Sequence, residues 1–108
     1  MDTKPRRDAH DAVQRDLQAE RAAALARATE QLEGALERLA KASAALAASP
    51  TPAARALRRD ALEHAAERLW FLVIQREAVG LRRHAETLDI LRVPREVRAA
   101  MGPRRRRR

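Results

Sequence analysis

Three histidines, His10, His64 and His84, are the residues of this sequence best suited to binding a metal or moving a proton. A di-iron site in a helical bundle needs a Glu-x-x-His pair on each of two helices. Here Asp60 precedes His64 by four residues and Glu67 follows it by three, so that motif is absent. His64 and Glu67 could share a metal across a symmetric dimer. We favour a solvated helix face instead, and we expect no metal and no cofactor.

Nucleophiles for hydrolysis or acyl transfer are scarce in this chain. The absence of cysteine excludes disulfides, Cys-ligated zinc and thiol catalysis. The only serines are Ser43 and Ser49, and neither a nucleophile elbow, a P-loop nor a dinucleotide fingerprint is present. The glutamates lie among arginine and lysine at helical spacing, which is typical of surface ion pairs. The sequence therefore predicts no catalytic residue and no enzymatic activity.

A polar pair, Arg76 and Glu77, directly follows the longest apolar run. Arg76 occupies a position at which the helical pattern calls for an apolar side chain, and a buried guanidinium needs an acidic partner. Glu77, or a glutamate from a facing chain, can provide that partner. We expect a buried polar pair that fixes the helix register, and the alternative is a contact with a small molecule or a partner.

The net charge of +8 is concentrated at the two ends of the chain. Residues 104–108 carry +5 and residues 1–7 carry +2, which leaves +1 on the body between them. The candidate phosphate-binding residues are Arg104, Arg105, Arg106, Arg107 and Arg108. A basic face on the third helix, formed by Arg92, Arg95 and Arg98, would extend this patch. Because Trp70 and Phe71 are expected in the core, base stacking is not available and any nucleic-acid binding would be non-specific. The simpler interpretation, which we favour, is a solvated tail.

Long helices must position all of these residues, since alanine, leucine, arginine and glutamate dominate and breakers are few. The first helix is predicted over about 9–48, with Asp8 as its N-cap. The sequence Ser49-Pro50-Thr51-Pro52 then ends it, because Pro50 disfavours helix at Ser49, whereas Thr51 can cap a new helix that starts at Pro52.

The second helix is predicted over about 52–86, and a short third helix over about 94–101. Accordingly, residues 1–7 are a disordered lead, residues 8–102 form a single helical domain, and residues 103–108 are a disordered Arg-rich tail.

So short a connection places the two long helices side by side and antiparallel. Leucines recur every seven residues along the first helix, each followed three residues later by alanine. The predicted hairpin seam consists of Leu25, Ala28, Leu32, Ala35, Leu39, Leu46, Leu62 and Ala65. Facing residues have numbers that sum to about 102, which places Leu32 near Trp70, and Val13 and Leu17 near Leu88.

Six consecutive apolar residues cover the whole circumference of the second helix, whereas one facing helix shields only one stripe. These residues are Leu69, Trp70, Phe71, Leu72, Val73 and Ile74. A hairpin about 60 Å long is also far from compact for a chain of this size. Dimerisation into a four-helix bundle through this run answers both problems. The alternative is a bent three-helix monomer in which the third helix folds back.

No apolar run approaches the roughly 18 residues of a membrane span, and the N-terminal 16 residues are too charged for a secretory signal. We therefore expect a cytoplasmic protein that does not enter a membrane.

Residues 68–102 carry several short motifs: Arg68-Leu69-Trp70, Gln75-Arg76-Glu77, Gly80-Leu81-Arg82 with His84, Val93-Pro94-Arg95-Glu96-Val97 and Met101-Gly102. In these motifs the sequence resembles a family of small bacterial α-helical proteins of unknown function. The resemblance implies a helical fold, and it implies no activity, cofactor or catalytic residue.

Taken together, the sequence predicts an all-α, non-enzymatic assembly or interaction protein that forms a homo-oligomer, most simply a dimer. The alternative is a protein that associates non-specifically with nucleic acid through its C-terminal tail.

Overall fold

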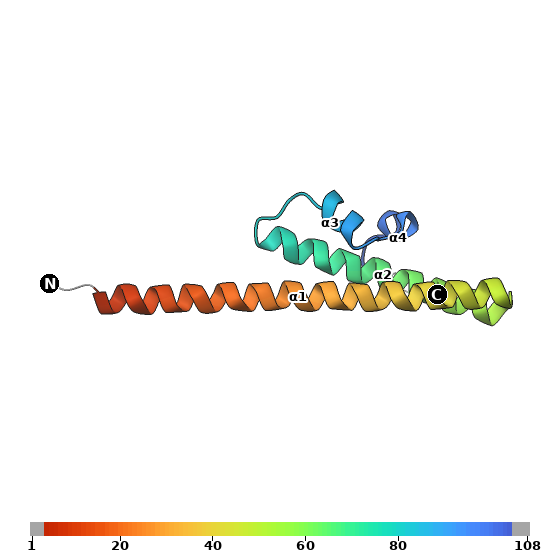
Figure 1. Cartoon of the computed structure of the whole chain (residues 1–108), viewed down its shortest axis with the longest axis horizontal. Coiled ribbons are helices and arrows are strands. Elements are labelled where there is room, and N and C mark those ends of the chain that lie inside the picture. The colour runs from red at the N-terminus through yellow and green to blue at the C-terminus, as the bar shows by residue number, and fades with distance from the viewer. Residues whose placement is uncertain (1–3, 105–108) are drawn as a thin grey trace.

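The computed structural model describes residues 4–104, and the described residues form helices joined by turns, without a β-strand. The helices are α1 (Lys4–Ala48), α2 (Pro52–Ala78), α3 (Ala85–Ile90) and α4 (Arg95–Ala99). Figure 1 shows α1 as a single rod along the whole molecule, with α2 beside one part of it and α3 and α4 stacked on α2. The prediction of an all-α fold built on a long hairpin is confirmed.

The connection between α1 and α2 follows from its prolines. Thr51 has extended backbone angles, and its Oγ1 accepts a hydrogen bond of 3.0 Å from the backbone N–H of Ala54. Pro52 takes the first helical position, where a missing N–H leaves no bond unmade. A cap of this kind stabilises a helix by about 1 kcal/mol.

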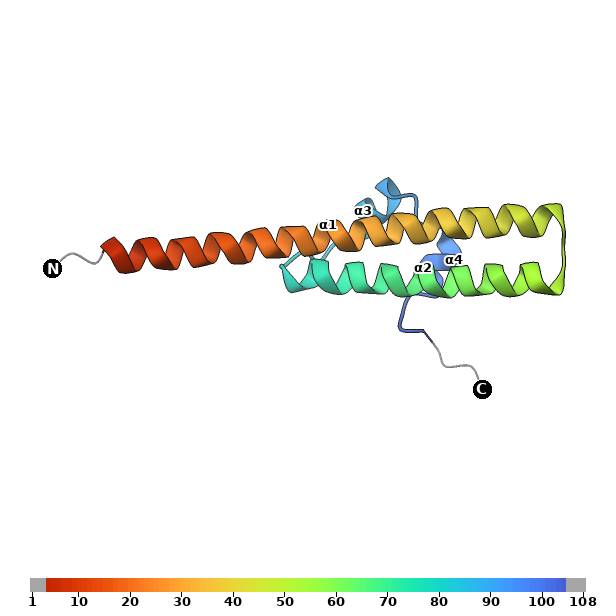
Figure 2. The same cartoon turned by 90° about the horizontal axis from the view of Figure 1, so that it is seen from below.

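The two long helices run antiparallel, as Figure 2 shows from below. Hydrogen bonds that cross the hairpin set its register, and the residue numbers of each pair sum to 98, 99 or 101, close to the predicted 102. These pairs are Arg38 with Asp60, Gln31 with Arg68, and Ser43 with Arg58. The structure buries five of the eight seam residues and leaves the other three partly buried. The buried residues are Ala28, Leu32, Ala35, Leu39 and Ala65, and the partly buried ones are Leu25, Leu46 and Leu62.

The helix α2 ends at Ala78, well before the predicted end near residue 86. The cause is Gly80, whose φ of +90° is in the left-handed region that glycine adopts without strain. The N–H groups of Gly80 and Leu81 bond back to the carbonyls of Glu77 and Arg76, at 3.0 and 2.9 Å respectively. These two hydrogen bonds together form the Schellman motif, which ends a helix and lets the chain change direction.

After Gly80 the chain returns along α2 and packs on it. Leu88 of α3, Val93 of the following turn and Val97 of α4 are buried in the same cluster as Leu69 and Leu72. The last helix is two residues shorter at its C-terminus than predicted, since it ends at Ala99. The return segment therefore covers part of the apolar circumference of α2 within one chain.

The first helix begins earlier than predicted, at Lys4, so residues 4–7 are helical and Asp8 is inside the helix instead of capping it. Pro5 does not prevent this, because proline is tolerated in the first turn of a helix. The remaining predicted lead, residues 1–3, lies outside the described residues.

The N-terminal part of α1 extends well beyond the end of α2 (Figures 1 and 2). Val13 and Leu17 were predicted to meet Leu88, and that prediction is wrong. Val13 is 55% exposed and Leu17 39%, while Leu88 is buried in the core on α2. The extension gives the chain dimensions of 75 × 31 × 19 Å and a radius of gyration of 19.3 Å, against about 13 Å for a compact chain of this length.

Candidate interaction surfaces

The six-residue apolar run is divided between the core and the surface. Leu69, Leu72 and Val73 are buried within the chain, and Trp70 is partly buried. Only Phe71 and Ile74 are exposed, at 39% and 42%. Leu69, Leu72 and Val73 are therefore not accessible to the predicted oligomer interface. The helix α1 and the segment that returns along α2 after Gly80 already cover them.

Phe71 is also partly covered by its neighbours in α2. Its ring centroid is 5.3 Å from that of Trp70, and the guanidinium of Arg68 is 5.3 Å from the Phe71 centroid. A guanidinium at this distance interacts favourably with the face of an aromatic ring. Arg68 also donates a hydrogen bond of 3.0 Å to Gln31 on α1, so it ties Phe71 to the hairpin.

The predicted buried pair of Arg76 and Glu77 is wrong in both burial and partner. Arg76 is only partly buried and Glu77 is exposed, because α2 ends two residues later. Arg76 donates through Nε to Nδ1 of His84 at 3.0 Å and through Nη2 to the carbonyl of Arg83 at 2.9 Å. His84 Nε2 lies 3.3 Å from a Glu77 oxygen, so a ring that carries its proton on Nε2 satisfies both neighbours. These contacts hold the return loop against the end of α2.

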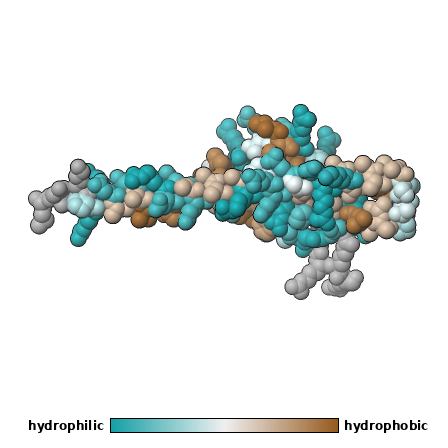
Figure 3. Space-filling model, turned by 60° about the horizontal axis from the view of Figure 1, so that its bottom comes forward, coloured by the Kyte–Doolittle hydropathy of each residue, from teal (hydrophilic) through white to brown (hydrophobic). Residues whose placement is uncertain are grey.

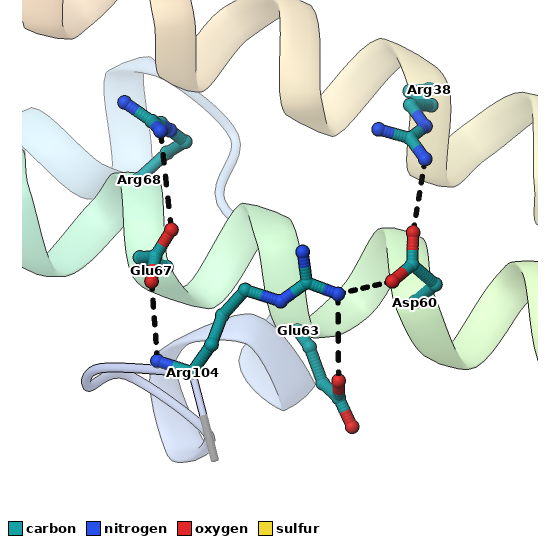
Figure 4. Close-up of polar contacts among 6 residues, drawn as sticks. All are labelled: Arg38, Asp60, Glu63, Glu67, Arg68 and Arg104. Carbon is teal, nitrogen blue, oxygen red and sulfur yellow. Dashed lines mark hydrogen bonds and ion pairs between the residues drawn. The ribbon is translucent and has the colours of Figure 1, made fainter. Parts of the chain in front are cut away.

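A ladder of carboxylates on α2, formed by Asp60, Glu63 and Glu67, receives the C-terminal segment (Figure 4). The guanidinium of Arg104 pairs with Asp60 and lies 3.8 Å from a Glu63 oxygen. Its backbone N–H donates to Glu67 at 3.2 Å. Pro103 and Arg104 thus belong to the folded body, although a disordered tail was predicted from residue 103. The other predicted phosphate-binding residues, 105–108, lie outside the described residues.

His64 lies among the residues of this ladder, where the surroundings oppose its protonation. Burial and the nearby guanidinium groups of Arg68, Arg38 and Arg104 lower the pKa of His64 below its usual 6.5, while Glu67 acts in the opposite sense. In residues 4–104 no three side chains of the His, Cys, Asp or Glu type come together as a metal site.

The predicted basic face of the third helix is partly neutralised. Arg98 donates to the carbonyl of Val93 and to Asp89, both at 2.9 Å. Arg92 and Arg95 are exposed. Arg92 also has a φ of +56°, because it takes the left-handed position that ends α3.

The N-terminal extension of α1, here called the arm, is a surface that the sequence did not predict. From Pro5 to Ala23 every residue is exposed except Ala12, which is partly buried. Leu17 and Ala24 of α1 and Gln75 of α2 line a shallow groove, which Phe71 and Arg68 continue along the hairpin. Figure 3 shows apolar side chains interrupting the hydrophilic surface of this arm. The signal in the sequence was Gly80, which shortens α2 and so leaves Val13 and Leu17 uncovered.

Among the described residues, no helix is both long enough and apolar enough to cross a lipid bilayer.

The model of a family described as Family of unknown function (DUF6665) matches residues 3–107. No curated protein and no solved structure matches the chain.

Proposed function

The chain belongs to this family of unknown function, and we propose that it is a non-enzymatic helical assembly protein that associates with a second copy of itself. The observation that carries the proposal is the bare arm of α1. The register of the hairpin places the end of α2 near residue 21 of α1, so roughly the first 18 residues of α1 have no helix of their own chain beside them.

Most helical stability in proteins comes from packing an apolar face, and this part of α1 has no such packing within its own chain. The arm presents Val13 and Leu17 on one side, and both are exposed in the single chain. A partner helix would remove these side chains from water and stabilise the arm at the same time. Assembly is therefore a role that the shape of the chain favours.

Two features argue against catalysis as the main role. Ser43 Oγ accepts a hydrogen bond of 3.0 Å from Nε of Arg58, which ties this hydroxyl to the hairpin. The titratable groups around His64 are paired with one another as ion pairs between elements, which is a structural use of such groups.

Light scattering of the full chain after size exclusion tests this proposal. At micromolar concentration we expect a mass of about twice 12.1 kDa. A stable mass of 12.1 kDa across the micromolar range would contradict self-association.

A second candidate function is non-specific binding of nucleic acid through Arg104–Arg108, which the concentration of charge in that segment favours. Replacing Arg105–Arg108 by glutamine while keeping Arg104 would separate tail binding from the contact between Arg104 and α2. We expect duplex affinity to fall and its dependence on salt to weaken. Unchanged affinity and salt dependence would exclude the tail as the binding element.

A further inference from the structure

We propose, on the basis of the self-association proposed above, that the arm of α1 (residues 5–21) pairs antiparallel with the same arm of a second copy, with Val13 on the two-fold axis. The surface is one face of the arm. At 100° per residue, Arg6, His10, Val13, Asp16, Leu17 and Glu20 share that face.

The charges on this face are complementary to themselves only when the two arms run in opposite directions. With Val13 opposite Val13 of the second copy, facing residues have numbers that sum to 26. Arg6 of one copy then faces Glu20 of the other, and His10 faces Asp16. Because of the two-fold symmetry each pair occurs twice. The two Arg6–Glu20 pairs join opposite charges, and the two His10–Asp16 pairs bring no like charges together.

The apolar residues agree with the same register. Val13 meets its own copy, and Leu17 meets Ala9 of the other arm. Leu17 also lines the groove that leads toward Gln75, so the apolar contact is continuous with the hairpin.

Two competing arrangements satisfy fewer charges. Parallel arms would place Arg6, Asp16 and Glu20 each beside its own copy, which brings like charges together. An antiparallel register displaced by one turn, with Val13 opposite Leu17, would place His10 opposite Glu20 but would leave Arg6 facing Ala24 and Asp16 facing Gln14.

The position of the end of α2 fits this partner. The cross-hairpin register places Ala78, the last residue of α2, at the level of about residue 21 of α1. In the proposed pairing Pro5 of the second copy lies at the level of Arg21. The second arm therefore begins at the level along α1 at which α2 ends.

The natural absence of cysteine permits a direct test by single-cysteine crosslinking. Val13→Cys places two thiols at the two-fold axis, within the roughly 7 Å between Cα atoms that a disulfide requires. Leu17→Cys is the matched control on the same face. Its two copies lie about 12 Å apart along antiparallel arms, because each residue advances the helix by about 1.5 Å.

Under mild oxidation we expect the Val13→Cys protein to form a disulfide-linked dimer and the Leu17→Cys protein to stay uncrosslinked. An equimolar mixture of Ala9→Cys and Leu17→Cys proteins should form the mixed dimer. Ala9, Val13 and Leu17 are all exposed and lie on the arm, so these substitutions do not change the core of the hairpin.

The outcomes separate this inference from the proposed function. A wild-type chain that is monomeric by light scattering overturns both. If the wild type is a dimer and the Val13→Cys and Leu17→Cys proteins crosslink equally well, the arms run parallel. If the wild type is a dimer and the Val13→Cys protein does not crosslink, the two copies pair through another surface or in another register. Either result contradicts the antiparallel pairing at Val13 but is compatible with self-association.

Discussion

At the scale of single residues, several polar side chains of residues 4–104 connect one element of the fold to another. Arg104 joins the C-terminal segment to Asp60 and Glu63, and Arg76 joins the end of α2 to His84. The types of these residues are visible in the sequence, but their partners are not, because each contact depends on where the chain reverses. Arg76 illustrates the difference, since the helical pattern pointed to Glu77 and the Gly80 turn brought His84 instead.

His64 provides a prediction at this scale. Its pKa is lowered by burial and by Arg68, Arg38 and Arg104, so the unfolded chain binds the proton more tightly than the folded chain does. The stabilising contribution is therefore fully present above pH 6.5 and is lost as the pH falls through 6.5 toward the lower folded value. Urea unfolding of the wild type and of His64→Gln between pH 8 and pH 5 measures this. We expect the stability of the wild type to fall more steeply with acidification, and parallel pH profiles for the two proteins would contradict the assignment.

At the scale of elements, the hairpin was predictable and the end of α2 was not. Two prolines flanking Thr51 mark the turn, and a heptad pattern sets the register to within a few residues. Gly80, by contrast, sits between Val79 and Leu81 in a pattern that could continue as helix. Gly80 permits the reversal, but the packing of Leu88, Val93 and Val97 back onto α2 is what favours it over a continued helix, and such tertiary packing is not encoded in local propensity.

Two residues in the left-handed region give a matched prediction for these helix ends. Gly80 (φ +90°) ends α2, and Arg92 (φ +56°) takes the equivalent position after α3. A side chain costs about 1 kcal/mol or more in this conformation. We expect Gly80→Ala to lower the free energy of unfolding by about 1 kcal/mol and Arg92→Gly to raise it by a similar or smaller amount.

The two variants control for each other in chemical denaturation. No heavy atom lies within 4 Å of the position of an added Cβ at Gly80, so its effect would come from the backbone alone. Changes of the same sign in both variants would show that the conformation at these positions does not determine stability.

At the scale of the whole molecule, the chain is an elongated hairpin with a bare arm, and we propose that a second copy covers this arm. The sequence predicted self-association from the run at Leu69–Ile74, whereas the structure buries half of that run and exposes Val13 and Leu17 instead. The surface that we propose for self-association is therefore the N-terminal part of α1 and not the middle of α2. That part could not be recognised from its composition, because it holds only two large apolar residues among many charges.

Charge reversal on the arm tests this pairing energetically. Glu20→Arg would place two arginines opposite each other at both ends of the paired arms, so we expect the dimer dissociation constant to rise about 10-fold or more. The double variant Arg6→Glu with Glu20→Arg restores opposite charges and should recover most of the affinity. Sedimentation equilibrium at low and high salt measures both constants. A double variant that is no tighter than Glu20→Arg would mean that Arg6 and Glu20 do not face each other.

Hydrogen exchange of the arm as a function of protein concentration tests the central claim most directly. The amides of residues 8–20 have only their own helix to protect them in a single chain, whereas the amides around Leu32 lie in the hairpin core. We expect exchange at residues 8–20 to slow markedly between nanomolar and micromolar protein, while exchange around Leu32 stays constant. Exchange of the arm that is independent of concentration, in a range where the chain is shown to associate, would contradict the claim that a second copy covers it.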